Sequence, residues 1–184
     1  MRILRRLLHF IAVRLLGVTL VFALLILSFY TAMNTANIWV LMDEGLQMRA
    51  GAVLTGKNAD RLSSYFREDF LSADPVLQVG LSDRSPYRDY TIRSFRHDVQ
   101  ILSIWSWPWE KTARAEVVER VPSIDGTIRS SSRAQALKEG GEERLNPPAW
   151  NGGRYRVSLV REKGRWKISN LQLLEALKEA PNGS

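Results

Sequence analysis

Cysteine is absent from the 184-residue sequence, and histidine occurs only twice, as His9 and His97. Without cysteine the chain has no disulfide scaffold, no thiol nucleophile and no thiolate metal site. Two histidines are too few for a multi-histidine zinc site, so we expect no bound metal. The sequence also lacks a glycine-rich phosphate-binding loop between a strand and a helix. We therefore predict a protein without a metal or other cofactor.

Charge is missing from a long N-terminal segment. Residues 15–42 contain no charged side chain, and residues 15–33 consist mainly of Leu, Val, Phe, Ala and Ile. At 1.5 Å per residue, a helix over residues 15–33 is about 28 Å long, which matches the hydrocarbon core of a bilayer. A buried helix of a small soluble domain would need a polar side, and before Ser28 this segment has a single polar side chain, Thr19. We predict that residues 15–33 form a transmembrane helix.

Positive charge is concentrated in front of this segment. The formal net charge is +7, and residues 1–14 supply +4 of it because they hold four basic and no acidic residues. The positive-inside rule then predicts a cytoplasmic tail, 1–14, and an extracytoplasmic domain, 34–184. The arginines that set this topology are Arg2, Arg5, Arg6 and Arg14. The balanced charge and the placement of the domain argue against nucleic acid as a partner.

A cleaved signal peptide is the main alternative to a permanent anchor. The basic N-terminal residues fit a signal peptide. However, the apolar stretch is long, and the residues that follow it offer no clean small-x-small cleavage site. These features favour an uncleaved signal anchor in the cell membrane.

The remaining residues predict an α+β domain with helices packed on one curved antiparallel sheet. The expected helices cover residues 34–55, with an apolar stripe at spacings of three and four, and residues 60–72, with Asp60 as N-cap. The expected strands cover residues 87–109, 112–121 and 154–162 and the stretch after a tight Lys163-Gly164 turn. Residues 75–86 predict a connector. Residues 122–153 are rich in Ser, Gly, Pro and mixed charges, and they predict a long loop or flexible insertion.

His97 is the candidate for acid–base chemistry in this domain. Strand alternation places it on an apolar face with Phe95, Val99, Ile101 and Trp105. A histidine buried there could act as an acid or base with a pKa tuned by its surroundings. The commoner role is structural, with the ring hydrogen-bonded in a half-buried sheet, and we favour that role.

Trp105, Trp107 and Trp109 form the most unusual short motif, WSWPW. In an extended strand they share one face, so that with Trp105 buried the row would run outward from the core. One interpretation is a binding surface for a protein partner, a glycan or the membrane interface. The other, which we favour, is a cap on the open end of the domain, with Pro108 preventing further pairing at that edge.

Basic side chains gather in residues 84–96 and 154–167. Such a surface could contact anionic lipid headgroups or an acidic envelope polymer. Acidic residues are interleaved with the basic ones, however, so a solvated face of the sheet is the favoured interpretation.

The order of elements resembles the nuclear transport factor 2-like superfamily. The residues that carry the resemblance are 62–66 (LSSYF) and 164–168 (GRWKI), within a stretch of about 38–175. The resemblance implies a cone-shaped domain, often self-associating through its sheet, with no fixed chemistry. Membrane-anchored members with this layout are frequent in bacterial envelopes, and they include components of type IV secretion and conjugation machines.

The uncleaved anchor, the lack of a catalytic motif and the tryptophan row predict an extracytoplasmic assembly or protein-interaction module of a bacterial envelope complex, and not an enzyme. Its partners would be further copies of the chain or other proteins of the complex. The alternative is a small-molecule-binding or lyase/isomerase-like cone enzyme that uses His97.

Overall fold

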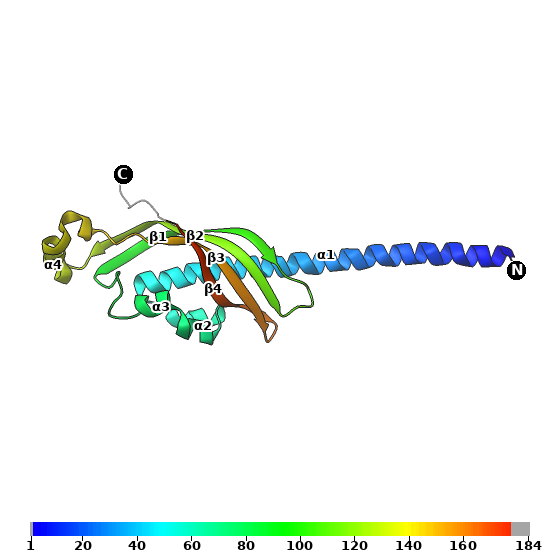
Figure 1. Cartoon of the computed structure of the whole chain (residues 1–184), viewed down its shortest axis with the longest axis horizontal. Helices are drawn as coiled ribbons and strands as arrows, with labels where there is room; N and C mark the ends of the chain where they lie inside the picture. Colours follow the sequence, from blue (N-terminus) through cyan, green and yellow to red (C-terminus); the bar gives the residue numbers. More distant parts are fainter. Residues whose placement is uncertain (1, 178–184) are drawn as a thin grey trace.

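The computed structural model describes residues 2–177, and the side chains of all of these except residues 2–5, 7 and 8. The helical elements are α1 (Arg2–Thr55), the 3-10 helix η1 (Ala59–Ser64), α2 (Glu68–Ala73), α3 (Pro75–Gly80), α4 (Ser130–Gly140) and the 3-10 helix η2 (Gly141–Leu145). The strands are β1 (Tyr90–Trp105), β2 (Thr112–Ile128), β3 (Gly152–Glu162) and β4 (Arg165–Leu177). They form one antiparallel sheet in the order β1-β2-β3-β4, which curves beside the C-terminal part of α1 (Figure 1). The predicted α+β class is confirmed.

Helix α1 has two halves with different surroundings. Residues 9–30 are exposed, and this part projects away from the domain (Figure 1). From Asn34 onward one side of the helix is buried. The stripe consists of Asn34, Ile38, Met42, Leu46, Arg49 and Val53, at spacings of three and four. Within residues 2–177, α1 alone is long and apolar enough to cross a membrane.

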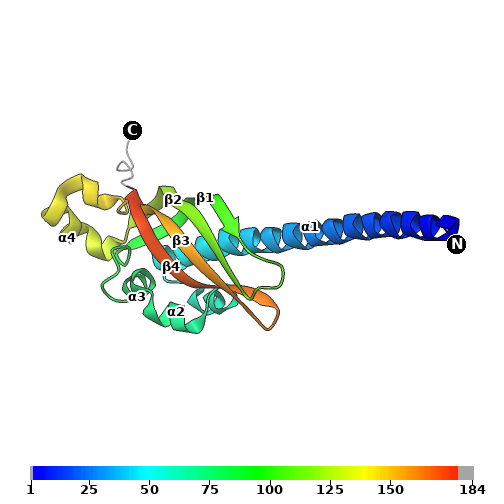
Figure 2. The same cartoon turned by 45° about the vertical axis from the view of Figure 1, so that its right-hand side comes forward.

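The core lies between the sheet and the C-terminal half of α1, with η1, α2 and α3 beside it (Figure 2). The sheet contributes Ala113, Ala115, Val117, Val157, Leu159, Trp166 and Ile168, and the helical side contributes Ile38, Met42, Leu46, Leu62 and Phe66. Residues 65–67 also pair with β4. The Ile168 N–H donates to the Tyr65 carbonyl (2.8 Å), and the Arg67 N–H donates to the Ile168 carbonyl (2.9 Å). This pairing covers the outer edge of the first part of β4.

Strand β1 changes the face it presents to the core. Its register against β2 shifts between Ile92 and Ser94 and again between Ile101 and Ser103. Each extra residue in β1 is a bulge, which reverses the alternation of side chains. The second bulge brings Ile104 to the core and leaves Trp105 66% exposed. The expectation that Trp105 lies on the buried face is therefore wrong, because simple alternation does not reveal a bulge.

The segment between α1 and β1 holds more helix than expected. The predicted helix over residues 60–72 is split into η1 and α2, and the residue before η1 is Asn58, with a left-handed φ of 58°, and not Asp60. The predicted connector over residues 75–86 begins with α3. Asp74 caps α3 by accepting a hydrogen bond from the Val76 N–H (3.1 Å), and Pro75 stands at the first helical position.

Residues 122–153 also differ from the expected loop. β2 continues to Ile128, which pairs with Tyr90, and α4 and η2 follow. The strand tolerates Pro122 because the β1–β2 register shifts at that point, between Arg120 and Ser123. The Lys163-Gly164 turn is confirmed, with φ of 48° and 84°, the positive values that a tight two-residue hairpin turn requires.

Candidate functional site

The interior of the domain holds a pair of titratable side chains, His97 and Glu119. The His97 Nε2 lies 3.0 Å from the Glu119 Oε1, and the two side chains are only 2% and 1% exposed. Glu119 occupies an inward position of β2, in alternation with Ala115, Val117 and Val121. The predicted placement of His97 on the apolar face is confirmed. We had not predicted its partner, although that alternation in the sequence carries the signal.

A second buried pair lies between α1 and the start of α3. Arg49 binds Asp74 through two hydrogen bonds, Nε to Oδ2 (2.6 Å) and Nη2 to Oδ1 (3.0 Å), with both side chains less than 5% exposed. Burial lowers the pKa of Arg49, but the hydrogen bond to Asp74 and the charges of Asp74 and Glu119 raise it, and the net shift is upward. The guanidinium therefore stays charged inside the domain.

Electrostatic coupling joins the two pairs into one group, the polar cluster of Arg49, Asp74, His97, Glu119 and Tyr155. Burial raises the pKa of the Tyr155 phenol, and the charge of Glu119 raises it further, while Arg49 opposes the shift. Within residues 2–177, Arg49 Nη1 and Glu119 Oε2 have no hydrogen-bond partner. A buried donor and acceptor of this kind are usually satisfied by an internal water or a polar ligand.

Tyr155 also lines an apolar groove on the surface of the domain. The groove has a volume of about 520 Å³ and lies between α3 and the loop that precedes β3. Val76 and Val79 of α3 are 43% and 45% exposed along it, and Trp150 borders the other side. The groove is therefore an apolar surface that meets the polar cluster at one residue.

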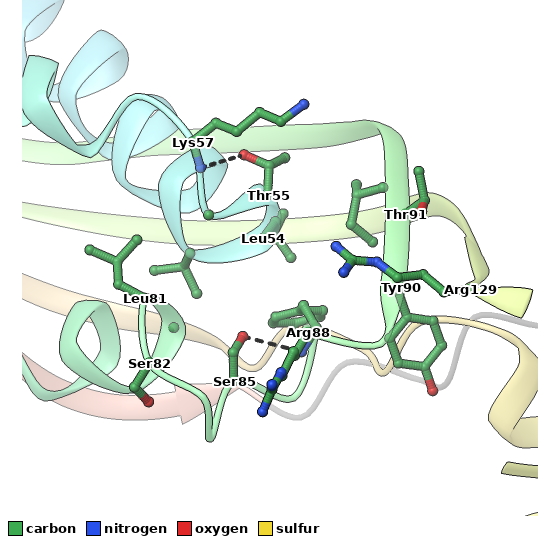
Figure 3. Close-up of a pocket in the computed structure, with 15 residues that line it drawn as sticks. Leu54, Thr55, Lys57, Leu81, Ser82, Ser85, Arg88, Tyr90, Thr91 and Arg129 are labelled. Carbon is green, nitrogen blue, oxygen red and sulfur yellow. Dashed lines mark hydrogen bonds between the residues drawn. The ribbon is translucent and has the colours of Figure 1, made fainter. Parts of the chain in front are cut away.

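A smaller cavity of about 260 Å³ lies where α1 ends (Figure 3). Lys57, Arg88 and Arg129 border it together with the Ser82 and Ser85 hydroxyls. The three cations are exposed, and Arg88 is already paired with Asp83 at 3.4 Å. Because its charges are solvated, we assign the cavity no chemistry.

Trp105, Trp107 and Trp109 gather at the tip of the β1–β2 hairpin. The rings of Trp105 and Trp107 meet edge to face with centroids 5.8 Å apart, and those of Trp107 and Trp109 stack at 5.1 Å. They are 66%, 41% and 68% exposed, and none belongs to the core or to the partly buried layer around it. The expectation that the row begins at a buried Trp105 is therefore wrong.

Asn34 ties the tips of both hairpins to α1. Its Nδ2 donates to the Ser106 Oγ in the β1–β2 tip (2.5 Å). Its Oδ1 accepts from Arg161 Nη2 in β3 (2.6 Å) and from Trp166 Nε1 in β4 (2.8 Å). Both tips consequently lie at the end of the domain from which the exposed part of α1 leaves, as Figures 1 and 2 show. We had not predicted a role for Asn34.

The remaining predicted residues lie on the exposed part of α1. Arg6 is exposed, and the Arg14 guanidinium lies over the Phe10 ring, 4.5 Å from its centroid. The side chains of Arg2 and Arg5 lie outside those that the structure describes. Among the described residues, no group of three or more His, Asp or Glu side chains is placed to hold a metal ion.

No protein-family model matches this chain, and no curated protein matches it.

Proposed function

We propose that this chain is a single-pass membrane protein that holds an assembly domain at the outer surface of the cell membrane, as part of a bacterial envelope complex. Residues 1–14 form the cytoplasmic tail, residues 15–33 cross the bilayer, and residues 34–184 lie outside it. The observation that carries the proposal is the continuity of α1: its apolar exposed half runs without a break into the half that forms the core of the domain.

This continuity fits a scaffold better than a freely diffusing protein. A flexible linker would let the domain sample many orientations, whereas a continuous helix holds it at one height and angle above the bilayer. Confinement to the membrane also raises the effective concentration of partners in the same membrane. Both effects favour assembly of a complex.

Two exposed surfaces support contact with other proteins. The apolar groove lies on α3, where the exposed Val76 and Val79 can take an apolar side chain or helix. The outer edge of β4 beyond Ile168 has no strand beside it within the described residues, and Leu173 there is 52% exposed. A free strand edge of this kind can pair with a strand of another copy or partner.

We also propose that the domain is of the nuclear transport factor 2-like type. The long helix against a curved antiparallel sheet supports this assignment. That type often self-associates through its sheet, which agrees with the open edge of β4.

Site-specific photo-crosslinking in native membranes tests the assembly function. We expect a crosslinker at Val79 or Leu173 to yield adducts with a second copy or with a discrete set of envelope proteins. The matched control is Lys138, an exposed residue of α4. Monomer alone from both test positions, at native expression levels, would contradict the proposal.

A second candidate function is a small-molecule-binding or lyase/isomerase-like enzyme. The His97–Glu119 pair favours it, because a carboxylate that holds an imidazole can orient it as an acid or base. Replacement of His97 by Ala separates the candidates. Loss of a ligand-dependent activity in a variant that still folds supports the enzyme, and a loss of stability alone supports a structural histidine.

A further inference from the structure

We propose that the tip of the β1–β2 hairpin, residues 105–111, docks into the headgroup layer of the bilayer that α1 crosses. The inference rests on the proposed membrane anchoring. It adds a second contact between the domain and the lipid, separate from the transmembrane helix. The occupant of this surface is therefore the membrane itself, and not a protein.

The depth of the tip follows from Asn34. This residue comes directly after the apolar segment 15–33, so it lies about 1.5 Å along the helix axis beyond Met33. The headgroup layer on each side of a bilayer is on the order of 5–8 Å thick, from a total of 40–45 Å around a 30 Å core. Asn34 thus lies within that layer, and its 2.5 Å hydrogen bond to Ser106 holds the hairpin tip at the same level.

The exposed side chains of the tip have the chemistry that this layer favours. Trp105, Trp107 and Trp109 place three indole rings in solvent, packed on each other and not on the domain. An indole ring is apolar with one N–H donor, and tryptophan is enriched at membrane–water interfaces for this reason. In water the cluster would be an exposed apolar patch without a function, whereas in the headgroup layer it is solvated by lipid.

Positive charge surrounds the tryptophans. Residues 105–114 and 161–167, which form the ends of the two hairpins, contain six basic and two acidic residues. Within residues 2–177, Lys111, Lys163 and Arg165 form no ion pair, whereas the arginines farther along the sheet, such as Arg93 and Arg154, are paired with acids. The unpaired cations fit an anionic lipid surface. The two hairpin tips thus combine an interfacial aromatic cluster with a cationic rim.

The absence of cysteine makes the inference directly testable with single-cysteine variants of the full chain. We would label Trp107→Cys, Leu20→Cys and Lys138→Cys with a fluorophore and place each protein in nanodiscs. The discs contain phosphatidylcholine, with or without phosphatidylglycerol and with brominated lipid as the quencher. Leu20 reports on the transmembrane helix, and Lys138, on α4 at the opposite end of the domain, is the solvent control (Figure 1).

We expect bromolipid to quench the label at position 107 strongly, the label at 20 most strongly and the label at 138 not at all. Lys163→Glu with Arg165→Glu should reduce quenching at 107 in phosphatidylglycerol discs and change it little in phosphatidylcholine discs. Quenching at 20 without quenching at 107 would overturn the hairpin contact and leave the anchor intact. No quenching at 20 would overturn the anchor and the inference together.

A label at Trp107→Cys itself removes one tryptophan, so a second measurement leaves the cluster whole. In an otherwise unchanged chain, Trp105, Trp107 and Trp109 supply the exposed tip fluorescence, and Trp39→Phe removes the exposed tryptophan of α1. Bromolipid should quench the tryptophan fluorescence of this Trp39→Phe protein. Further replacement of the three tip tryptophans by Ser should abolish most of that quenching. If the label at position 107 is shielded from a water-soluble quencher in native membranes but not in lipid discs, a protein partner covers the tip, and the lipid assignment is overturned.

Discussion

At the scale of single residues, the domain keeps its buried charges in pairs. Arg49 and Asp74 satisfy each other with two hydrogen bonds, and Asp74 also caps α3. A paired buried charge contributes little net stability, but removal of one partner leaves the other charge without compensation. Sequence patterning gave only a hint of this arrangement: Arg49 stands in the apolar stripe of its helix, and Glu119 stands among the inward residues of β2. Their partners come from distant segments, so the pattern could not identify them.

Replacement of Arg49 by Met should therefore be strongly destabilising. The Asp74 carboxylate would remain buried and unpaired, at a cost of about 3–5 kcal/mol in the free energy of unfolding. The double variant Arg49→Met with Asp74→Asn should recover most of this loss, because Asn removes the charge and still accepts from the Val76 N–H. Urea unfolding of both single variants and the double variant measures the coupling. If the losses in the free energy of unfolding of the two single variants add up in the double variant, the pairing is contradicted.

Ionisation of Tyr87 should lower the stability of the domain at alkaline pH. Burial raises the pKa of its phenol to about 12, whereas an unfolded tyrosine titrates near 10. The folded state then holds the proton more tightly than the unfolded chain. The stabilisation that the neutral Tyr87 phenol gives the folded state is thus complete below about pH 10 and is lost as the pH rises toward 12. The raised pKa of Tyr155 acts in the same direction.

Between about pH 9 and 12, the free energy of unfolding should fall by about 2–3 kcal/mol because of Tyr87, as two pKa units at 1.36 kcal/mol each imply. Tyr87→Phe should make this decline shallower, and Tyr90→Phe, which alters a half-buried phenol that donates to the Arg144 carbonyl (2.9 Å), is the comparison variant. Urea midpoints across this pH range provide the measurement. Equal slopes for the wild type and Tyr87→Phe would refute the assignment.

At the scale of elements, α1 and the two hairpins form the framework of the domain. The helical period of residues 34–55 and the Lys163-Gly164 turn could be predicted because both are local patterns. The bulges of β1 could not, since they depend on pairing with β2, and they reversed the predicted placement of Trp105. The strand and helix in residues 122–153 were also missed, because a polar sequence that pairs through its backbone looks like a loop.

We expect Asn34 to hold the ends of both hairpins against α1. Asn34→Ala removes three hydrogen bonds and leaves Arg161 and the Trp166 N–H without their acceptor, at a cost of about 3 kcal/mol. Asn37→Ala, an exposed position of the same helix, controls for helix propensity. Hydrogen exchange should show faster opening of both hairpin ends in Asn34→Ala alone. Unchanged exchange there would show that other contacts hold the ends.

At the scale of the whole molecule, one helix joins an apolar, exposed segment to the core of a folded domain. The exposed apolar part of α1 lies at one end of the described chain and the folded domain at the other, and the β1–β2 hairpin tip points toward the end from which α1 leaves (Figure 2). Sequence composition alone predicted the apolar segment and its basic flank. The relation of the hairpin tips to that segment needed the structure, because it depends on side chains far apart in the chain, such as Asn34 and Ser106.

The central claim is that the chain crosses the membrane once, with the domain outside. Three single-cysteine variants, His9→Cys, Leu20→Cys and Ser130→Cys, can be treated with a membrane-impermeant maleimide in cells whose outer barrier alone has been made permeable, and again after the cell membrane is broken. The account predicts that Ser130→Cys is labelled once the outer barrier is made permeable, His9→Cys only after the cell membrane is broken, and Leu20→Cys in neither condition. Labelling of His9→Cys from outside, or recovery of the protein in the soluble fraction, would contradict it.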